Sequence, residues 1–274
     1  MKMYTKTLGK ENATLFTSLA EQGKLVFSLA DAQAVTGKNY QATLQALHRL
    51  IAAGWLVRLG GGNYAIVSPE SGAEAIPTAS RLVIGRELAG DAAYYLSHES
   101  AMEVHDLLTR PITTVTITSV RRLQSRQVAG VAYHFVFSKA YNMWGFEPSW
   151  VSPSEQVQVS DLERTIIDGL NRPDLCGGIS EVATAMVIGN TRTDWSKLAQ
   201  YAGRINKNSV IKRLGYLSEL LELSDRSIID GLNKKISPSY AQLDPALPDE
   251  GKFLDRWKLQ LNLDPEILEK VALT

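Results

Sequence analysis

SLADAQAVTGKNYQATLQALHRLIAAGWLVRLGGGNYAIV, residues 28–67, is the stretch that decides the fold we expect for this chain. Ser28 stands where a helix cap is needed, and Asp31 takes the matching capping-box position. Gly37 supplies the positive φ with which many helices end. These signals predict a short helix that is closed by a tight turn.

A second, amphipathic helix is predicted directly after this turn. Asn39 is a good N-cap residue, and the helix that it opens runs to Gly54. Its apolar residues recur at helical spacing on one face: Leu44, Leu47, Leu50 and Ile51. The opposite face carries polar side chains: Gln41, Gln45, His48 and Arg49.

A two-stranded hairpin completes the pattern. Residues 55–59 and 64–67 have strand composition, and the glycine-rich residues 60–63 between them predict a tight turn. Upstream, residues 12–22 predict a first helix. The order of helix, turn, helix and hairpin is the outline of a winged helix-turn-helix, which favours DNA binding.

The local charge agrees with this interpretation. Residues 32–69 contain no Asp or Glu but include Lys38, Arg49 and Arg58, whereas the 29 basic and 29 acidic residues of the whole chain cancel. A surface that faces phosphates must avoid carboxylates, because they oppose the counterion release that drives DNA affinity. The alternatives are a winged helix used only for protein contacts, or a surface that lacks acids by chance.

These features predict a set of DNA-binding side chains. Five are expected to enter the major groove, where Gln and Asn can read adenine: Lys38, Asn39, Gln41, Thr43 and Gln45. Three more are expected at phosphates or in the minor groove beside the hairpin: Arg49, Arg58 and Asn63. Tyr40 either joins the DNA contacts or packs with the apolar face of its helix.

Length and composition predict two domains in a chain of 274 residues. The polar residues 68–74 have linker composition, so we place an N-terminal winged-helix domain at 1–77 and a larger domain at 78–274. The single cysteine, Cys176, suits a reducing cytoplasm. No stretch is apolar enough to span a membrane, and Met1–Lys6 lacks the core of a signal peptide. We therefore expect a cytoplasmic protein.

The second domain mixes helices and strands, so the predicted class is α+β. Strands are expected at 92–96, 112–120, 131–137, 157–159 and 256–261, the second and third of them paired. Helices are expected at 79–88, from Ser97 to 108, after a Ser160–Glu163 capping box, at 179–188, 194–201, 209–222 and 225–232, and after Pro265.

Two further clusters of positive charge stand out. Residues 192–213 contain one acid, Asp194, against six basic residues: Arg192, Lys197, Arg204, Lys207, Lys212 and Arg213. They form either a second surface for nucleic acid or an acidic partner, or a solvated helical face. Arg121, Arg122 and Arg126 lie between two predicted strands, as expected for a hairpin tip.

No enzyme motif is convincing, and we expect neither catalytic residues, nor a metal, nor a cofactor. His98 and His105 share a helix face and could bind metal with Glu99 or Asp106, but a solvated helix explains them as well. Residues 249–252 offer carboxylates and a lysine, as a metal-dependent nuclease would need, in a Pro/Gly-rich loop. The nuclease alternative depends on His98 or Glu250, and a pure protein-interaction module is a third alternative.

One pattern occurs twice. Residues 164–171 read RTIIDGLN and residues 226–233 read RSIIDGLN, with unrelated flanks. Two amphipathic helices that end in the same way explain the repeat without a domain duplication.

The succession of motifs resembles the AbiEi family of antitoxins, the DNA-binding half of AbiE-type (type IV) bacterial toxin–antitoxin pairs. The resemblance starts in the pattern of residues 44–64 and continues in YLSHESAM at 95–102 and VQVSDLERTIID at 157–168. It covers most of the chain up to about Pro238.

This resemblance implies a transcriptional repressor that autoregulates its operon by binding inverted repeats in the promoter. It also implies a C-terminal domain that counteracts a nucleotidyltransferase-like toxin, with direct contact left open. The expected partners are double-stranded DNA and this toxin, and no membrane is expected. The expected oligomeric state is a monomer or weak dimer, with cooperative binding to DNA left open. A solitary regulator without an antitoxin role is the alternative.

Overall fold

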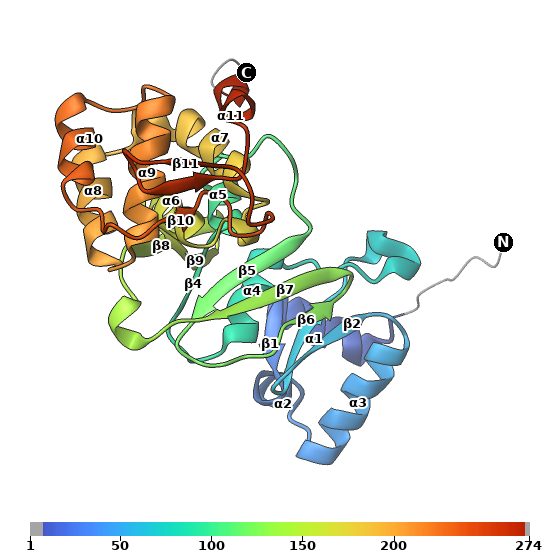
Figure 1. Cartoon of the computed structure of the whole chain (residues 1–274). Helices are drawn as coiled ribbons and strands as arrows, with labels where there is room; N and C mark the ends of the chain where they lie inside the picture. The colour runs from blue at the N-terminus through green and yellow to red at the C-terminus, as the bar shows by residue number, and fades with distance from the viewer. Residues whose placement is uncertain (1–7, 272–274) are drawn as a thin grey trace. The chain divides into compact units, whose positions relative to one another are not determined.

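The computed structural model describes residues 8–271, and it is a mixed α+β structure (Figure 1). The expectation for Met1–Lys6 lies outside these residues. The chain divides into unit 1, with Met1–Tyr94, Thr113–Phe137 and Pro148–Gln158, and unit 2, with Tyr95–Ile112, Ser138–Glu147 and Val159–Thr274. The predicted domain boundary after residue 77 therefore falls inside unit 1.

Unit 1 opens with three helices and a small antiparallel sheet. The elements are α1 (Lys10–Glu21), β1 (Val26–Ser28), α2 (Leu29–Thr36), α3 (Tyr40–Ala52), β2 (Leu56–Gly60) and β3 (Asn63–Ile66), with the strands in the order β1-β3-β2. The predicted helices and hairpin are confirmed, but β1 was not predicted. It pairs with β3, so that Phe27 stacks on Tyr64 with ring centroids 5.9 Å apart.

Local signals place α2 and α3 as predicted. The Ser28 hydroxyl accepts a bond from the Asp31 backbone N–H at 3.1 Å, and the Asp31 carboxylate accepts one from Ser28 N–H at 2.8 Å. Gly37 ends α2 with φ 65° in the left-handed region. Helices α1 and α3 and the sheet enclose a core of buried apolar side chains: Leu15, Leu19, Phe27, Leu47, Leu50, Trp55, Leu56 and Tyr64.

The rest of unit 1 adds a helix and a second group of strands. These are the 3-10 helix η1 (Pro69–Glu74), α4 (Arg81–Ala89), β5 (Thr114–Ser119), β6 (Arg126–Val128) and β7 (Val131–Phe137). β5 and β7 are paired, as predicted, but they run parallel, and β6 pairs antiparallel with β7 (Figure 1). The arginines between β5 and β7 are therefore not the tip of a β5–β7 hairpin. Two strands, β8 (Phe146–Ser152) and β9 (Glu155–Ser160), cross from one unit to the other.

Unit 2 is mostly helical. Its helices are α5 (Glu99–Val104), α6 (Leu162–Asn171), α7 (Ile179–Gly189), α8 (Trp195–Arg204), α9 (Asn208–Leu220), α10 (Arg226–Asn233) and α11 (Pro265–Val271), with β4 (Tyr94–Leu96) paired to β9 through Leu96 and Val159. A small sheet has the order β10-β12-β11, from Ala241–Gln242, Leu259–Leu261 and Lys252–Leu254. Within the described range, no helix has the length and apolar character to cross a membrane.

Two predicted helix caps in unit 2 are wrong by one residue. Ser97 was expected to cap α5, but the cap position is His98, at φ 54° and without a side-chain capping bond. Ser160 was expected to cap α6, but Asp161 does so, with its carboxylate accepting from Arg164 N–H at 2.7 Å. The predicted capping-box acid, Glu163, bonds Lys197 and the backbone of Asp194 instead.

Candidate nucleic-acid interface

Helix α3 presents a continuous polar surface to solvent. Thr43, Leu47 and Leu50 are buried against the core of unit 1. The exposed residues of the helix include Gln41, Gln45, His48 and Arg49, the four that the sequence placed on its polar side. We call these four the α3 face. Its amide and cationic side chains can donate hydrogen bonds to bases and phosphates, and it contains no carboxylate.

The start of α3 corrects one predicted DNA contact and qualifies another. Thr43 is 1% exposed, and its hydroxyl donates to the backbone oxygen of Asn39 at 3.0 Å. Thr43 therefore cannot reach a base, and its role is to fix the first turn of the helix. Asn39 is exposed, but its side-chain oxygen accepts from Ala42 N–H at 2.9 Å, so this oxygen is used as the helix cap.

Tyr40 does not pack with the apolar side of α3. Its side chain is 54% exposed at the first position of the helix. Burial of an aromatic ring is a large gain in folding, so a ring left in solvent is available for a partner. This exposure rules out the packing alternative for Tyr40, and the contact to DNA stays a prediction.

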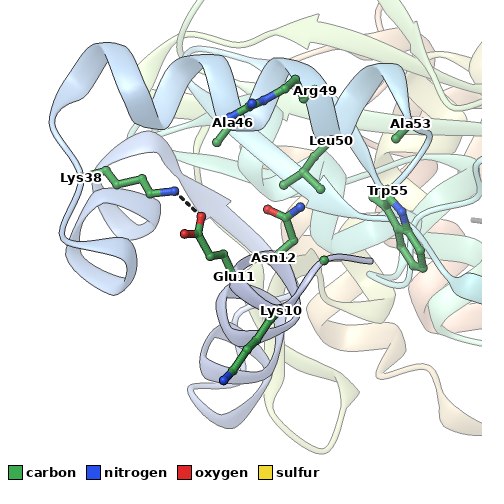
Figure 2. A pocket seen from close by; sticks show the side chains of 10 residues that line it. Lys10, Glu11, Asn12, Lys38, Ala46, Arg49, Leu50, Ala53 and Trp55 are labelled. Atoms are coloured by element: carbon green, nitrogen blue, oxygen red, sulfur yellow. Dashed lines mark hydrogen bonds and ion pairs between the residues drawn. The ribbon is translucent and has the colours of Figure 1, made fainter. Parts of the chain in front are cut away.

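An open groove of about 450 Å³ runs between α1 and α3 (Figure 2). Lys38 and Glu11 close one end of it with an ion pair of 2.6 Å, while Leu50 and Trp55 form part of its apolar lining. The hydrogen bond and charge of Lys38, with a smaller contribution from Arg49, lower the pKa of the Glu11 carboxyl. Lys38 is therefore partly neutralised in the free protein.

Glu11 is the residue of this site that the sequence did not reveal. It lies in α1, and its carboxylate is brought to Lys38 across 27 positions of the chain. Its side chain is 79% exposed, which leaves a negative charge beside an otherwise basic surface. No spacing or motif in the sequence signals this pair, because it forms only when α1 packs beside α2 and α3.

The hairpin of β2 and β3 holds two more predicted residues. Arg58 is exposed on β2, and it forms no ion pair with any residue whose side chain the structure describes. Asn63 is half-buried at the start of β3, opposite Gly60. The turn between the strands needs glycine, because Gly60, Gly61 and Gly62 all have positive φ, at 98°, 61° and 84°.

This turn is tied to the helices. The backbone N–H of Leu29, the first residue of α2, donates to the backbone oxygen of Gly62 at 3.0 Å. Lys24 also forms an ion pair with Asp31 at the start of α2. The hairpin turn and the start of α2 are thus held together by a direct bond.

The predicted second basic surface does not exist as one surface, because two of its residues are internal. Lys212 and Arg213 are 1% and 4% exposed on α9. The Lys212 ammonium donates to Ser239 O and Ser237 Oγ, and the Arg213 guanidinium donates to Leu170 O at 2.7 Å and to Gln242 O at 2.9 Å. Burial lowers the pKa of Arg213 to about 10. Both cations therefore bind backbone carbonyls inside unit 2.

The other four residues of that cluster have different surroundings. Lys197 pairs with Glu163 at 2.7 Å and with Asp161 at 3.2 Å. Arg204 lies over the ring of Trp144, with its Cζ 4.3 Å from the centroid, and Arg192 donates to His105 O at 2.7 Å. Lys207 is exposed. Arg192, Arg204 and Lys207 are thus exposed, whereas Lys197 is paired with two carboxylates, so the six cations do not form one continuous positive patch.

The residues considered for metal binding in unit 2 are also engaged in the fold. His98 is buried, its Nδ1 lies 2.8 Å from Ser97 Oγ, and burial lowers its pKa to about 4. His105 Nε2 lies 2.7 Å from Ser160 O. In the part of the chain that the structure describes, no group of three or more His, Cys, Asp or Glu residues is placed to hold a metal ion.

Comparisons with known proteins extend only to the fold. No family model and no curated protein matches the chain. Among solved structures, the chain is similar to the crystal structure of the RV2827C protein from Mycobacterium tuberculosis, with 16% sequence identity and a TM-score of 0.70. The match covers 93% of this chain and 92% of that chain. At this identity the likeness establishes a shared α+β fold.

Proposed function

We propose that this protein is a sequence-specific DNA-binding repressor whose α2, α3 and β2–β3 hairpin act as a winged helix-turn-helix. In this proposal α3 is the recognition helix in the major groove, and the hairpin is the wing that lies against the DNA backbone. The order of the elements and the bond between α2 and the hairpin turn support the assignment.

The α3 face is the observation that carries this proposal. A recognition helix needs hydrogen-bonding side chains that are free in the unbound protein, on a rigid support and without carboxylates. Gln41 and Gln45 meet this need one helical turn apart, and Arg49 continues the same line. The capped start of α3 and its buried leucines provide the support.

The side chains are expected to divide the work. Gln41 and Gln45 would read adenine edges, and each good bidentate contact gives about 1–3 kcal/mol of discrimination. Arg49 and Arg58 would bind phosphates, which fixes the register of the helix without reading sequence. Lys38 joins them once it separates from Glu11, and Tyr40 is free to pack against sugar or base.

The role of the rest of the chain is proposed from the resemblance to AbiEi antitoxins. On that basis the protein represses its own toxin–antitoxin operon at promoter inverted repeats. The C-terminal domain expected at residues 78–274 counteracts a nucleotidyltransferase-like toxin. A solitary regulator would share the DNA-binding features. Co-expression with the product of the adjacent gene distinguishes them, because only the antitoxin restores growth.

A salt-titrated binding assay tests the DNA-binding proposal directly. The full chain is titrated onto the DNA upstream of its own gene and onto a scrambled duplex of equal length. The proposal predicts tighter binding to the upstream DNA and a linear fall of log K with log salt. Equally weak binding to both duplexes at low salt would overturn it.

Arg58→Ala provides an internal control for this assay. Because Arg58 is exposed and expected at a phosphate, its removal should weaken both duplexes alike and reduce the salt slope by about 1. The matched variant Lys207→Ala removes an exposed cation from unit 2 and should leave binding unchanged. Incubation with magnesium or manganese in the same experiment tests the nuclease alternative, which requires cleaved DNA.

A further inference from the structure

A second acid-free segment belongs to unit 1. Residues 107–146 contain no Asp or Glu, and the part of this segment that lies in unit 1 carries Arg121, Arg122 and Arg126. All three arginines are exposed. The sequence alone gave no reason to connect them with the winged-helix region, because more than sixty positions separate Arg58 from Arg126.

The fold brings Arg126 to the hairpin turn of β2 and β3. A Cβ atom built on Gly60 would lie 3.1 Å from Nη1 of Arg126. Gly60 is the last residue of β2, two positions after Arg58. Both residues belong to unit 1, so this contact lies within one compact body.

Arg126 keeps its charge available at this position. It lies on β6, the edge strand of its sheet, and forms no ion pair with any residue that the structure describes. Arg122 of the same segment is held over the ring of Phe137, with Cζ 4.2 Å from the centroid. Arg126 is therefore the member of the three that the structure places at the hairpin.

We propose that Arg126 is a further DNA-backbone contact, which binds a phosphate beside the one bound by the Arg58 region and so lengthens the footprint beyond the wing. The inference rests on the proposed DNA-binding function. An arginine at the edge of the hairpin turn adds positive charge at the point where a wing meets the DNA backbone, and no carboxylate from its own segment opposes it. The glycines of the turn let the phosphate chain approach closely.

The test compares Arg126→Ala and Arg126→Lys with the wild-type chain on the upstream duplex, by salt titration and hydroxyl-radical footprinting. Arg126→Ala should reduce the salt slope by about 1, weaken binding several-fold at low salt and remove protection at the flank of the site. Arg126→Lys should retain most of the slope. Arg226→Ala, which removes an exposed arginine from unit 2, is the matched control and should behave as wild type.

The outcomes separate this inference from the proposed function. Wild-type slope and footprint in Arg126→Ala would overturn the inference, while tight upstream binding would leave the repressor proposal standing. Equal defects in the Ala and Lys variants would assign the effect to packing of the Arg126 side chain against the hairpin, and this result would also overturn the inference. Absence of salt-dependent binding by the wild-type chain would overturn the proposed function itself.

Discussion

Two basic segments of this chain are alike in composition but differ in what the fold does with their charges. Residues 38–58 contain no acid and residues 192–213 contain only Asp194, so both could be taken for anion-binding surfaces. In the first, Arg49 and Arg58 are exposed, whereas in the second Lys212 and Arg213 are buried. The difference arises because other elements surround α9 on several sides, whereas they cover α3 on one side only.

Helix α3 lies at the periphery of unit 1, and helix α9 lies in the middle of unit 2. α3 contacts α2 and β2 on one side, which leaves the α3 face in solvent. α9 contacts α6, α8, α10 and β10, and its residues from Val210 to Ser218 are all buried. A Cβ at Gly215 would lie 2.0 Å from the Trp257 ring, so no side chain fits there. A cation on such a helix must find partners inside the protein.

The largest effect is expected for Arg213→Ala. The change leaves the buried carbonyl oxygen of Leu170 and the partly buried one of Gln242 without their donor, so the free energy of unfolding should fall by about 3 kcal/mol. Urea unfolding measures it, and Arg192→Ala, at an exposed site, should cost less than about 0.5 kcal/mol. Equal stability losses in the two variants would contradict the distinction between buried and exposed cations in this segment.

Gln45→Ala is expected to change specificity rather than stability. Because Gln45 is exposed, folding should be unaffected, but the preference for upstream over scrambled DNA should fall by about 1–3 kcal/mol. Competition binding with both duplexes measures this preference. A loss of the same size on both duplexes would show that Gln45 does not read bases.

The stability of α2, which packs against α3, should fall at acidic pH because of Asp31. Burial raises the pKa of this carboxyl, but hydrogen bonds from Lys24 and Ser28 outweigh burial and lower it from 3.8 to about 2. The carboxylate therefore stabilises the fold above about pH 4, and this contribution is lost as the pH falls toward 2. Asp31→Asn should cost about 1 kcal/mol at neutral pH.

Urea unfolding at several pH values measures this contribution. The difference in free energy of unfolding between wild type and Asp31→Asn should shrink between pH 4 and pH 2. A difference that stays constant over this range would show that the ionised carboxylate does not hold the start of α2.

The smallest effect is a gain of affinity in Glu11→Gln. The amide removes a carboxylate from the edge of the DNA-binding surface and releases Lys38, so DNA affinity should rise about two- to five-fold at low salt. Glu21→Gln, at the exposed end of the same helix, is the matched control. Unchanged or weaker binding by Glu11→Gln would mean that the Lys38–Glu11 pair persists on DNA.

The sequence predicted the parts of unit 1 that local signals determine. The Ser28–Asp31 capping box, the Gly37 terminator and the spacing of the leucines in α3 act within a few residues, and each gave an element close to its observed bounds. β1 was missed because three residues show no alternation, and its strand character comes from pairing with β3. Thr43 was wrongly assigned to DNA. Its burial results from the packing of α3 on the rest of unit 1, which local sequence does not reveal.

The repeated RTIIDGLN and RSIIDGLN patterns show the same limit of local information. Both are helices, as predicted, at α6 and α10. In α6, Arg164 and Asp168 are buried and bonded to each other at 2.9 Å, whereas in α10 Asp230 is half-buried and 3.7 Å from Arg256. Nearly identical local sequence thus gives a helix in both places, and the surrounding elements decide whether its charged side chains are buried or exposed.

The most direct test of the central claim is a paired charge reversal, measured by binding to the upstream duplex at low salt. One variant carries Arg49→Glu and Arg58→Glu in the first segment, and the other carries Arg192→Glu and Lys207→Glu in the second. We predict that the first variant loses specific binding and that the second binds within about twofold of wild type. Retained binding by the first variant and loss by the second would contradict the account.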